Sequence, residues 1–124
     1  MKVLVVDNQL DYSRLVARWL RKLGGAVRVE LAESSAEALS LMESMTPDLI
    51  ITDLAMPEMD GFELTRKAKE KAPAPVVVVM TSIQPPRFSE LASAAGADYC
   101  VEKGSLQRRL PEFLQKRFGL GPRN

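Results

Sequence analysis

The chain has 124 residues, of which 46% are apolar, a composition typical of one globular domain with a substantial core. Its net charge of +1 gives no reason to expect direct binding to nucleic acid or to an anionic membrane. The single cysteine excludes an internal disulfide and favours a cytoplasmic location, and the lack of histidine excludes imidazole chemistry.

The first half of the chain alternates short apolar runs with longer helical patterns. The run Val3 to Val6 predicts a first strand and is too short for a signal-peptide core or for membrane insertion. Apolar residues at helical spacing predict a helix over 10–23, ended by the two glycines at 24 and 25. Alternation at 27–31 predicts a second strand, and the capping box at 34–37 opens a second helix.

The second half continues the same alternation. A strand at 48–53 ends on a carboxylate, and a helix follows at 61–71. The unbroken apolar run 76–80 is typical of a strand buried on both faces. A fourth helix is marked by Phe88, Leu91, Ala92 and Ala95, a short strand follows at 99–101, and the last helix has apolar residues from 106 to 118. Pro111 lies inside that last pattern, so the helix either starts there or kinks.

Strands that alternate with helices predict an α/β fold, in which a parallel sheet is covered by helices on both faces. The crossovers between strands should be right-handed. We expect one domain over 1–118 and a flexible C-terminal tail over 119–124.

Polar residues follow four of the predicted strands, at the edge where an open parallel sheet binds ligands. They are Asp7 and Asn8 after the first strand, Asp53 after the third, Thr81 after the fourth and Lys103 after the fifth. Two carboxylates brought together repel unless a cation lies between them or one of them binds a proton. Oxygen ligands in small number suit Mg²⁺, while a lysine and a hydroxyl suit a phosphoryl group. The carboxylate of Asp53 would then be a nucleophile.

At these positions the sequence resembles the response-regulator receiver family, the CheY-like domains. The matching segments are Val-Val-Asp-Asn at 5–8, Asp-Leu-Ile-Ile-Thr-Asp at 48–53, Met-Pro-Glu-Met-Asp-Gly at 56–61, Met-Thr-Ser at 80–82 and Gly-Ala-Asp-Tyr at 96–99, running to Lys103. The resemblance covers about 1–118 and implies a doubly wound (βα)5 three-layer sandwich of flavodoxin-like type. Its five parallel strands would have the order 2-1-3-4-5.

The resemblance also implies a function. Asp53 would accept a phosphoryl group from a histidine kinase or phosphotransfer protein, with Thr81 as the switch hydroxyl and Lys103 as the phosphate-binding lysine. The protein would be a signalling switch of a two-component phosphorelay rather than a turnover enzyme. It would act on an unidentified downstream protein through its fourth helix, fifth strand and fifth helix, and a homodimer stays open.

The family pattern implies a Mg²⁺ site made by Asp7, Asn8, Asp53 and the backbone carbonyl of Ala55. Asn8 stands where a second acidic residue is usual, so the affinity for Mg²⁺ should fall. Gly104 stands where proline is usual after the lysine, so we expect no cis peptide bond there.

Cys100 replaces the aromatic residue that relatives carry on the fifth strand, so the coupling between threonine and aromatic ring should be altered or absent. By itself this cysteine is best interpreted as a small buried apolar residue. Trp19 is interpreted as a packing residue of the first helix. Asp7 and Asn8 have a structural interpretation as helix N-caps.

Three other functions compete with the phosphorylation switch. A pseudo-receiver would bind proteins without phosphorylation, and Asn8, Gly104 and Cys100 support that alternative. A flavodoxin-like cofactor protein would need a phosphate-binding loop rich in Ser, Thr or Gly, whereas the sequence at 7–11 is acidic. A DNA-binding regulator would need an output domain, for which we expect no room in this sequence.

Overall fold

One parallel sheet forms the middle layer of the protein, in a computed structural model that describes residues 1–24 and 26–120. The strands are β1 (Lys2–Val6), β2 (Arg28–Ala32), β3 (Leu49–Asp53), β4 (Val76–Thr81) and β5 (Tyr99–Glu102). The helices are α1 (Leu10–Arg21), α2 (Ser35–Ser44), α3 (Gly61–Lys69), α4 (Phe88–Ala95) and α5 (Lys103–Phe118). The sheet order is β2-β1-β3-β4-β5, so the predicted doubly wound α/β fold is confirmed.

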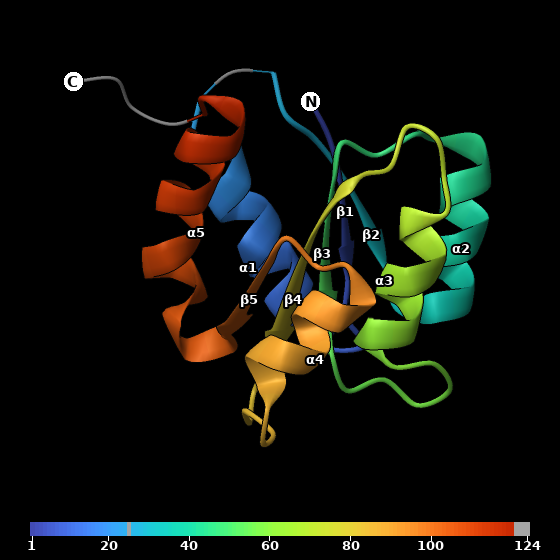
Figure 1. Ribbon diagram of the computed structural model, residues 1–124. Helices are drawn as coiled ribbons and strands as arrows, with labels where there is room; N and C mark the ends of the chain where they lie inside the picture. Colours follow the sequence, from blue (N-terminus) through green and yellow to red (C-terminus); the bar gives the residue numbers. More distant parts are fainter. Residues whose placement is uncertain (25, 121–124) are drawn as a thin grey trace.

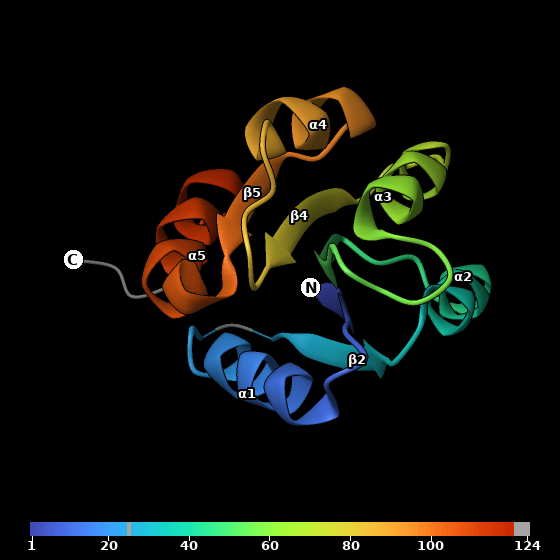
Figure 2. The ribbon, with the colours of Figure 1, turned by 90° about the horizontal axis from the view of Figure 1, so that it is seen from below.

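Two helices cover one face of the sheet and three cover the other. Figures 1 and 2 show α1 and α5 together on one side, and α2, α3 and α4 on the opposite side. Successive strand residues point to opposite faces, so each strand contributes to two apolar cores. In β1, Leu4 and Val6 pack in the core under α2, α3 and α4, whereas Val3 and Val5 pack in the core under α1 and α5.

All strands run in the same direction, so their carboxyl ends lie at one edge of the sheet, which faces the viewer in Figure 2. The register aligns Asp53 at the end of β3 with Met80 of β4, and Thr81 with Glu102 of β5. β4 is buried along its whole length, as its unbroken apolar run predicts. This edge is where the polar residues of the sequence analysis were expected to meet.

The capping residues agree with the sequence pattern, whereas several boundaries differ from it. Ser34 caps α2 by accepting a hydrogen bond from the backbone N–H of Glu37 at 3.1 Å. Both α1 and α3 end earlier than predicted, at Arg21 and Lys69. Gly24 follows α1 with a left-handed φ of 86°, and the glycine at 25 lies outside the described residues. Leu91, one of the apolar residues that mark the fourth helix, is 38% exposed.

The last helix decides between the two alternatives for Pro111 only in part. α5 begins at Lys103, so the alternative of a helix start at Pro111 is excluded and the proline lies inside the helix. Proline lacks an N–H, so the helix loses one backbone hydrogen bond there. Leu106, Leu110 and Leu114, which lie on both sides of the proline along the chain, are nevertheless buried against the sheet. Tertiary packing of this apolar face therefore outweighs the local cost of the proline.

The predicted domain boundary at 118 coincides with the end of α5. Gly119, with φ of 72°, donates its N–H to the carbonyl of Gln115 at 2.9 Å and closes α5. Leu120 packs against the core under α5. The rest of the predicted tail, 121–124, lies outside the described residues. Within the described part of the chain, no helix is both long and apolar enough to cross a membrane.

Candidate functional site

Lys103 joins two buried carboxylates at the carboxyl edge of the sheet. Its ammonium nitrogen lies 2.7 Å from Oδ2 of Asp7 and 3.4 Å from Oδ2 of Asp53. Asp7 follows β1, Asp53 ends β3, and Lys103 opens α5 directly after β5. Asp7 is fully buried and Asp53 is 5% exposed. The structure thus brings together three of the residues that sequence analysis selected, from distant parts of the chain.

The environment of Asp53 disfavours its negative charge. Burial is the main cause that raises the pKa of this carboxyl above its ordinary value, and the neighbouring Asp7 raises it further. The ammonium of Lys103 and the backbone N–H of Ala55 act in the opposite direction without cancelling the effect. A cation that approached these carboxylates would therefore stabilise the ionised form of Asp53.

The segment after β3 returns so closely to its start that only glycine fits at position 61. Gly61 donates its N–H to the carbonyl of Leu54 at 2.8 Å. A Cβ atom at Gly61 would lie 2.5 Å from the carbonyl oxygen of Asp53, closer than real Cβ contacts. Asp60 caps α3 by accepting from the N–H of Glu63 at 2.9 Å. Asp60 and Gly61 therefore shape the backbone around Asp53.

In the loop after β1, neither Asp7 nor Asn8 is the N-cap residue of α1. Gln9 is the N-cap residue of α1, so the interpretation of Asp7 or Asn8 as the N-cap is wrong. Oδ1 of Asp7 accepts a hydrogen bond from the backbone N–H of Gln9 at 2.8 Å, which fixes the carboxylate orientation. The side-chain oxygen of Gln9 lies 3.4 Å from the ammonium of Lys103, a contact that sequence analysis missed. Asn8 is exposed.

Tyr12 is a second site residue that sequence analysis missed. Its hydroxyl donates to the backbone carbonyl of Lys103 at 3.0 Å, and its ring centroid lies 4.8 Å from the ammonium. Burial, with smaller contributions from Asp7 and Asp53, raises the pKa of Tyr12 to about 12. Tyr12 lies three positions after Gln9, a spacing that places both residues on one helix face. Because the contact of Gln9 was itself missed, this spacing gave no signal for Tyr12.

Thr81 lies at the same edge but its hydroxyl is directed elsewhere. Thr81 is 3% exposed, and its hydroxyl donates to the carbonyl of Ile83 at 2.8 Å. Ile83 itself is 83% exposed. The structure therefore places Thr81 at the end of β4 as predicted, with a hydroxyl engaged by the following loop rather than by Asp53.

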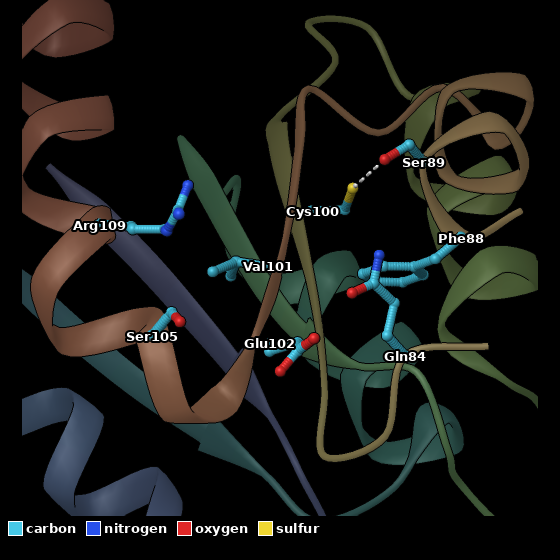
Figure 3. Close-up of a pocket in the computed structure, with 8 residues that line it drawn as sticks. All are labelled: Gln84, Phe88, Ser89, Cys100, Val101, Glu102, Ser105 and Arg109. Carbon is cyan, nitrogen blue, oxygen red and sulfur yellow. Dashed lines mark hydrogen bonds between the residues drawn. The ribbon is translucent and has the colours of Figure 1, made fainter. Parts of the chain in front are cut away.

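A groove lies between α4 and α5 over β5. It has a volume of about 260 Å³ and is lined by Gln84, Phe88, Ser89, Cys100, Val101, Glu102, Ser105 and Arg109 (Figure 3). Cys100 is only half-buried, and its thiol donates to the hydroxyl of Ser89 at 3.8 Å, so the expectation of a buried cysteine was wrong.

The oxygen donors at this edge fit a magnesium ion. Within residues 1–24 and 26–120 no group of three or more acidic, cysteine or histidine side chains could hold a metal. Mg²⁺ often uses one or two carboxylates and keeps several waters, so the carboxylates of Asp7 and Asp53 satisfy its preference. The other two predicted ligands, Asn8 and Ala55, are both exposed residues. Across the described residues the one cis peptide bond joins Ala72 and Pro73, so the bond after Lys103 is trans, as predicted.

A family model described as "Response regulator receiver domain" matches residues 3–115. Among curated proteins, a protein-glutamate methylesterase/protein-glutamine glutaminase of Syntrophus aciditrophicus is 34% identical over 88% of this chain and 32% of its own length. Response regulator GacA of Pseudomonas aeruginosa is 30% identical over 95% of this chain and 55% of its own length. The chain thus spans only part of the curated relatives that it matches.

Solved structures show the same fold. A CheY-like receiver domain protein from Methanospirillum hungatei has a TM-score of 0.83 and 27% identity, and the match covers 94% of this chain and 91% of that one. Chemotaxis protein CheY4 of Vibrio cholerae has a TM-score of 0.81 and 28% identity, with coverage of 93% and 96%.

Proposed function

This chain belongs to the response regulator receiver domain family of two-component systems, and from that premise we propose that Asp53 is its phosphoacceptor. The observation that carries the proposal is the ammonium of Lys103 placed between the buried carboxylates of Asp7 and Asp53. A structural lysine would need only one partner, whereas a phosphoryl group on Asp53 needs a cation already beside it. We propose that residues 1–118 form the receiver domain, with Gly119 and Leu120 closing its last helix.

In the proposed reaction, a carboxylate oxygen of Asp53 attacks the phosphorus of a phosphohistidine on a histidine kinase or phosphotransfer protein. The P–N bond breaks, its electron pair returns to the imidazole, and an acyl phosphate forms on Asp53. The ammonium of Lys103 lies close enough to offset charge on the phosphoryl oxygens. Mg²⁺, when bound, neutralises charge that develops during in-line transfer. Asp7, Asn8, Asp53 and the carbonyl of Ala55 would hold it.

The proposed output is a change of protein binding at the surface formed by α4, β5 and α5. The hydroxyl of Thr81 would leave the carbonyl of Ile83 for the phosphoryl group and move the loop before α4. The downstream protein is unidentified, and a homodimer through this surface is one arrangement that the proposal allows. The single cysteine supports a cytoplasmic setting for this switch.

The test is phosphorylation by acetyl phosphate with and without Mg²⁺, followed by intact mass measurement. The wild-type protein should gain the mass of one phosphoryl group only with Mg²⁺, and Asp53→Asn should not gain it. Asp11→Asn is the matched control, because it makes the same substitution at a fully exposed side chain. A gain of mass by Asp53→Asn at the wild-type rate would show that another residue is the acceptor. No gain by the wild-type protein would favour binding without phosphorylation.

A further inference from the structure

We propose that Tyr12 is a positioning residue that holds the ammonium of Lys103 against the carboxylates of Asp7 and Asp53. The value of this position for phosphorylation rests on the proposed function. The position of the Lys103 ammonium does not rest on the proposed function, because it is a property of the unphosphorylated protein.

Tyr12 contacts Lys103 at both ends of the lysine. The phenol hydroxyl donates to the backbone carbonyl at 3.0 Å, and the ring centroid lies 4.8 Å from the ammonium nitrogen. Lys103 is the first residue of α5, and the N-cap residue Glu102 makes no side-chain capping hydrogen bond. The start of α5 therefore depends on contacts from outside the helix, and Tyr12 supplies one of them across 91 positions of sequence.

The ammonium of Lys103 is held from two sides. The carboxylate oxygens of Asp7 and Asp53 lie at 2.7 and 3.4 Å, and the negative face of the Tyr12 ring lies at 4.8 Å. The lysine side chain is 9% exposed, which makes both attractions stronger than they would be in water. A lysine has a long flexible stem, so without the ring it would gain conformations that leave Asp53. The ring therefore selects the conformation that the site needs.

Tyr12 is itself fixed by its neighbours. Its ring meets that of Trp19 edge to face, with centroids 6.2 Å apart and an interplanar angle of 88°. With a pKa of about 12, the phenol stays protonated at neutral pH and remains a hydrogen-bond donor. Both contacts to Lys103 therefore persist over the pH range in which Asp53 would react.

The first test measures the position of Lys103 in the unphosphorylated protein by NMR. The ring of Tyr12 should shift the ε-methylene and ammonium proton signals of Lys103 upfield, and slow the exchange of the ammonium protons with water. Tyr12→Phe keeps the ring and should keep the upfield shift, whereas Tyr12→Leu should lose it. Tyr99→Leu is the matched control, because Tyr99 stacks on Phe113 at 4.8 Å and is the only other tyrosine in the chain.

The second test measures phosphorylation by acetyl phosphate in the same variants. Tyr12→Leu should react roughly two- to thirty-fold more slowly, which is the range of cation–π energies expressed as a ratio of rates. Tyr12→Phe should lie closer to the wild type, and Tyr99→Leu should match it. The proposal is overturned if Lys103 signals in Tyr12→Leu stay at wild-type positions, or if Tyr99→Leu slows the reaction equally. If the wild-type protein is not phosphorylated, the proposed function fails, while the NMR result still decides the position of Lys103.

Discussion

Replacing Gly61 by alanine should destabilise the protein and disturb the phosphoacceptor. The new Cβ would lie 2.5 Å from the carbonyl oxygen of Asp53 and 2.9 Å from the Cα of Leu54. Both neighbours are backbone atoms, so no rotamer change can relieve the overlap. Forcing extra volume into a packed site costs about 1–3 kcal/mol. An alanine in a helix gains about 1 kcal/mol over glycine, so a net loss of up to roughly 2 kcal/mol remains.

The assay is urea unfolding of Gly61→Ala, with Gly104→Ala as the matched control. A slope of about 1–3 kcal/mol per molar urea converts the expected loss into a midpoint lower by roughly 1 M. Gly104 also lies in the first turn of a helix, has no positive φ, and has no neighbouring atom within 4 Å of the place where a Cβ would lie. Gly104→Ala should therefore stabilise by about 0.5–1 kcal/mol. Equal midpoints for the two variants would refute the steric argument.

Three further predictions concern charge and motion at the site. Because the pKa of Asp53 is raised in the folded protein, the native state binds the proton of this carboxyl more tightly than the unfolded chain does, and the stability falls as rising pH ionises Asp53. In urea unfolding at pH values from about 3 to 7, Asp53→Asn should therefore become more stable relative to the wild type as the pH rises. A stability difference that stays constant with pH would contradict this prediction. Asn8→Asp should bind Mg²⁺ more tightly by calorimetry, since it adds an anionic ligand, and unchanged affinity would contradict that. Beryllofluoride with Mg²⁺ should change hydrogen exchange from Thr81 to Ala95 and leave α1 and α2 unchanged, and identical exchange over Thr81 to Ala95 would favour the pseudo-receiver alternative.

The sequence was sufficient for the sheet and for the residues at its edge. Polar residues lie at the ends of four of the predicted strands, and parallel strands bring such ends together. Asp7, Asp53 and Lys103 were therefore predictable as neighbours from the order of strands and helices along the chain. The prediction depended on the spacing of these three residues along the chain and on the segment 53–61.

Other features depend on how elements pack, which local patterns do not specify. The contact between Tyr12 and Lys103 requires the rotation of α1 about its axis, and that rotation is fixed by packing on the sheet. The helical conformation before Pro111 depends on burial of Leu106 and Leu110 rather than on propensity. The hydrogen bond from Thr81 to Ile83 depends on the path of a loop with no periodic pattern. These features became visible only in three dimensions.

The position of the Thr81 hydroxyl suggests how the switch would work in a protein with Cys100 on β5. In this structure the hydroxyl donates to the neutral carbonyl of Ile83. A phosphoryl group on Asp53 would offer a charged acceptor, and charge-assisted hydrogen bonds are about twice as strong as neutral ones. Thr81 would then turn toward Asp53 and release Ile83, which is already 83% exposed. Because Cys100 is too small to fill the groove of about 260 Å³ beside it, the movement would pass to the loop and α4.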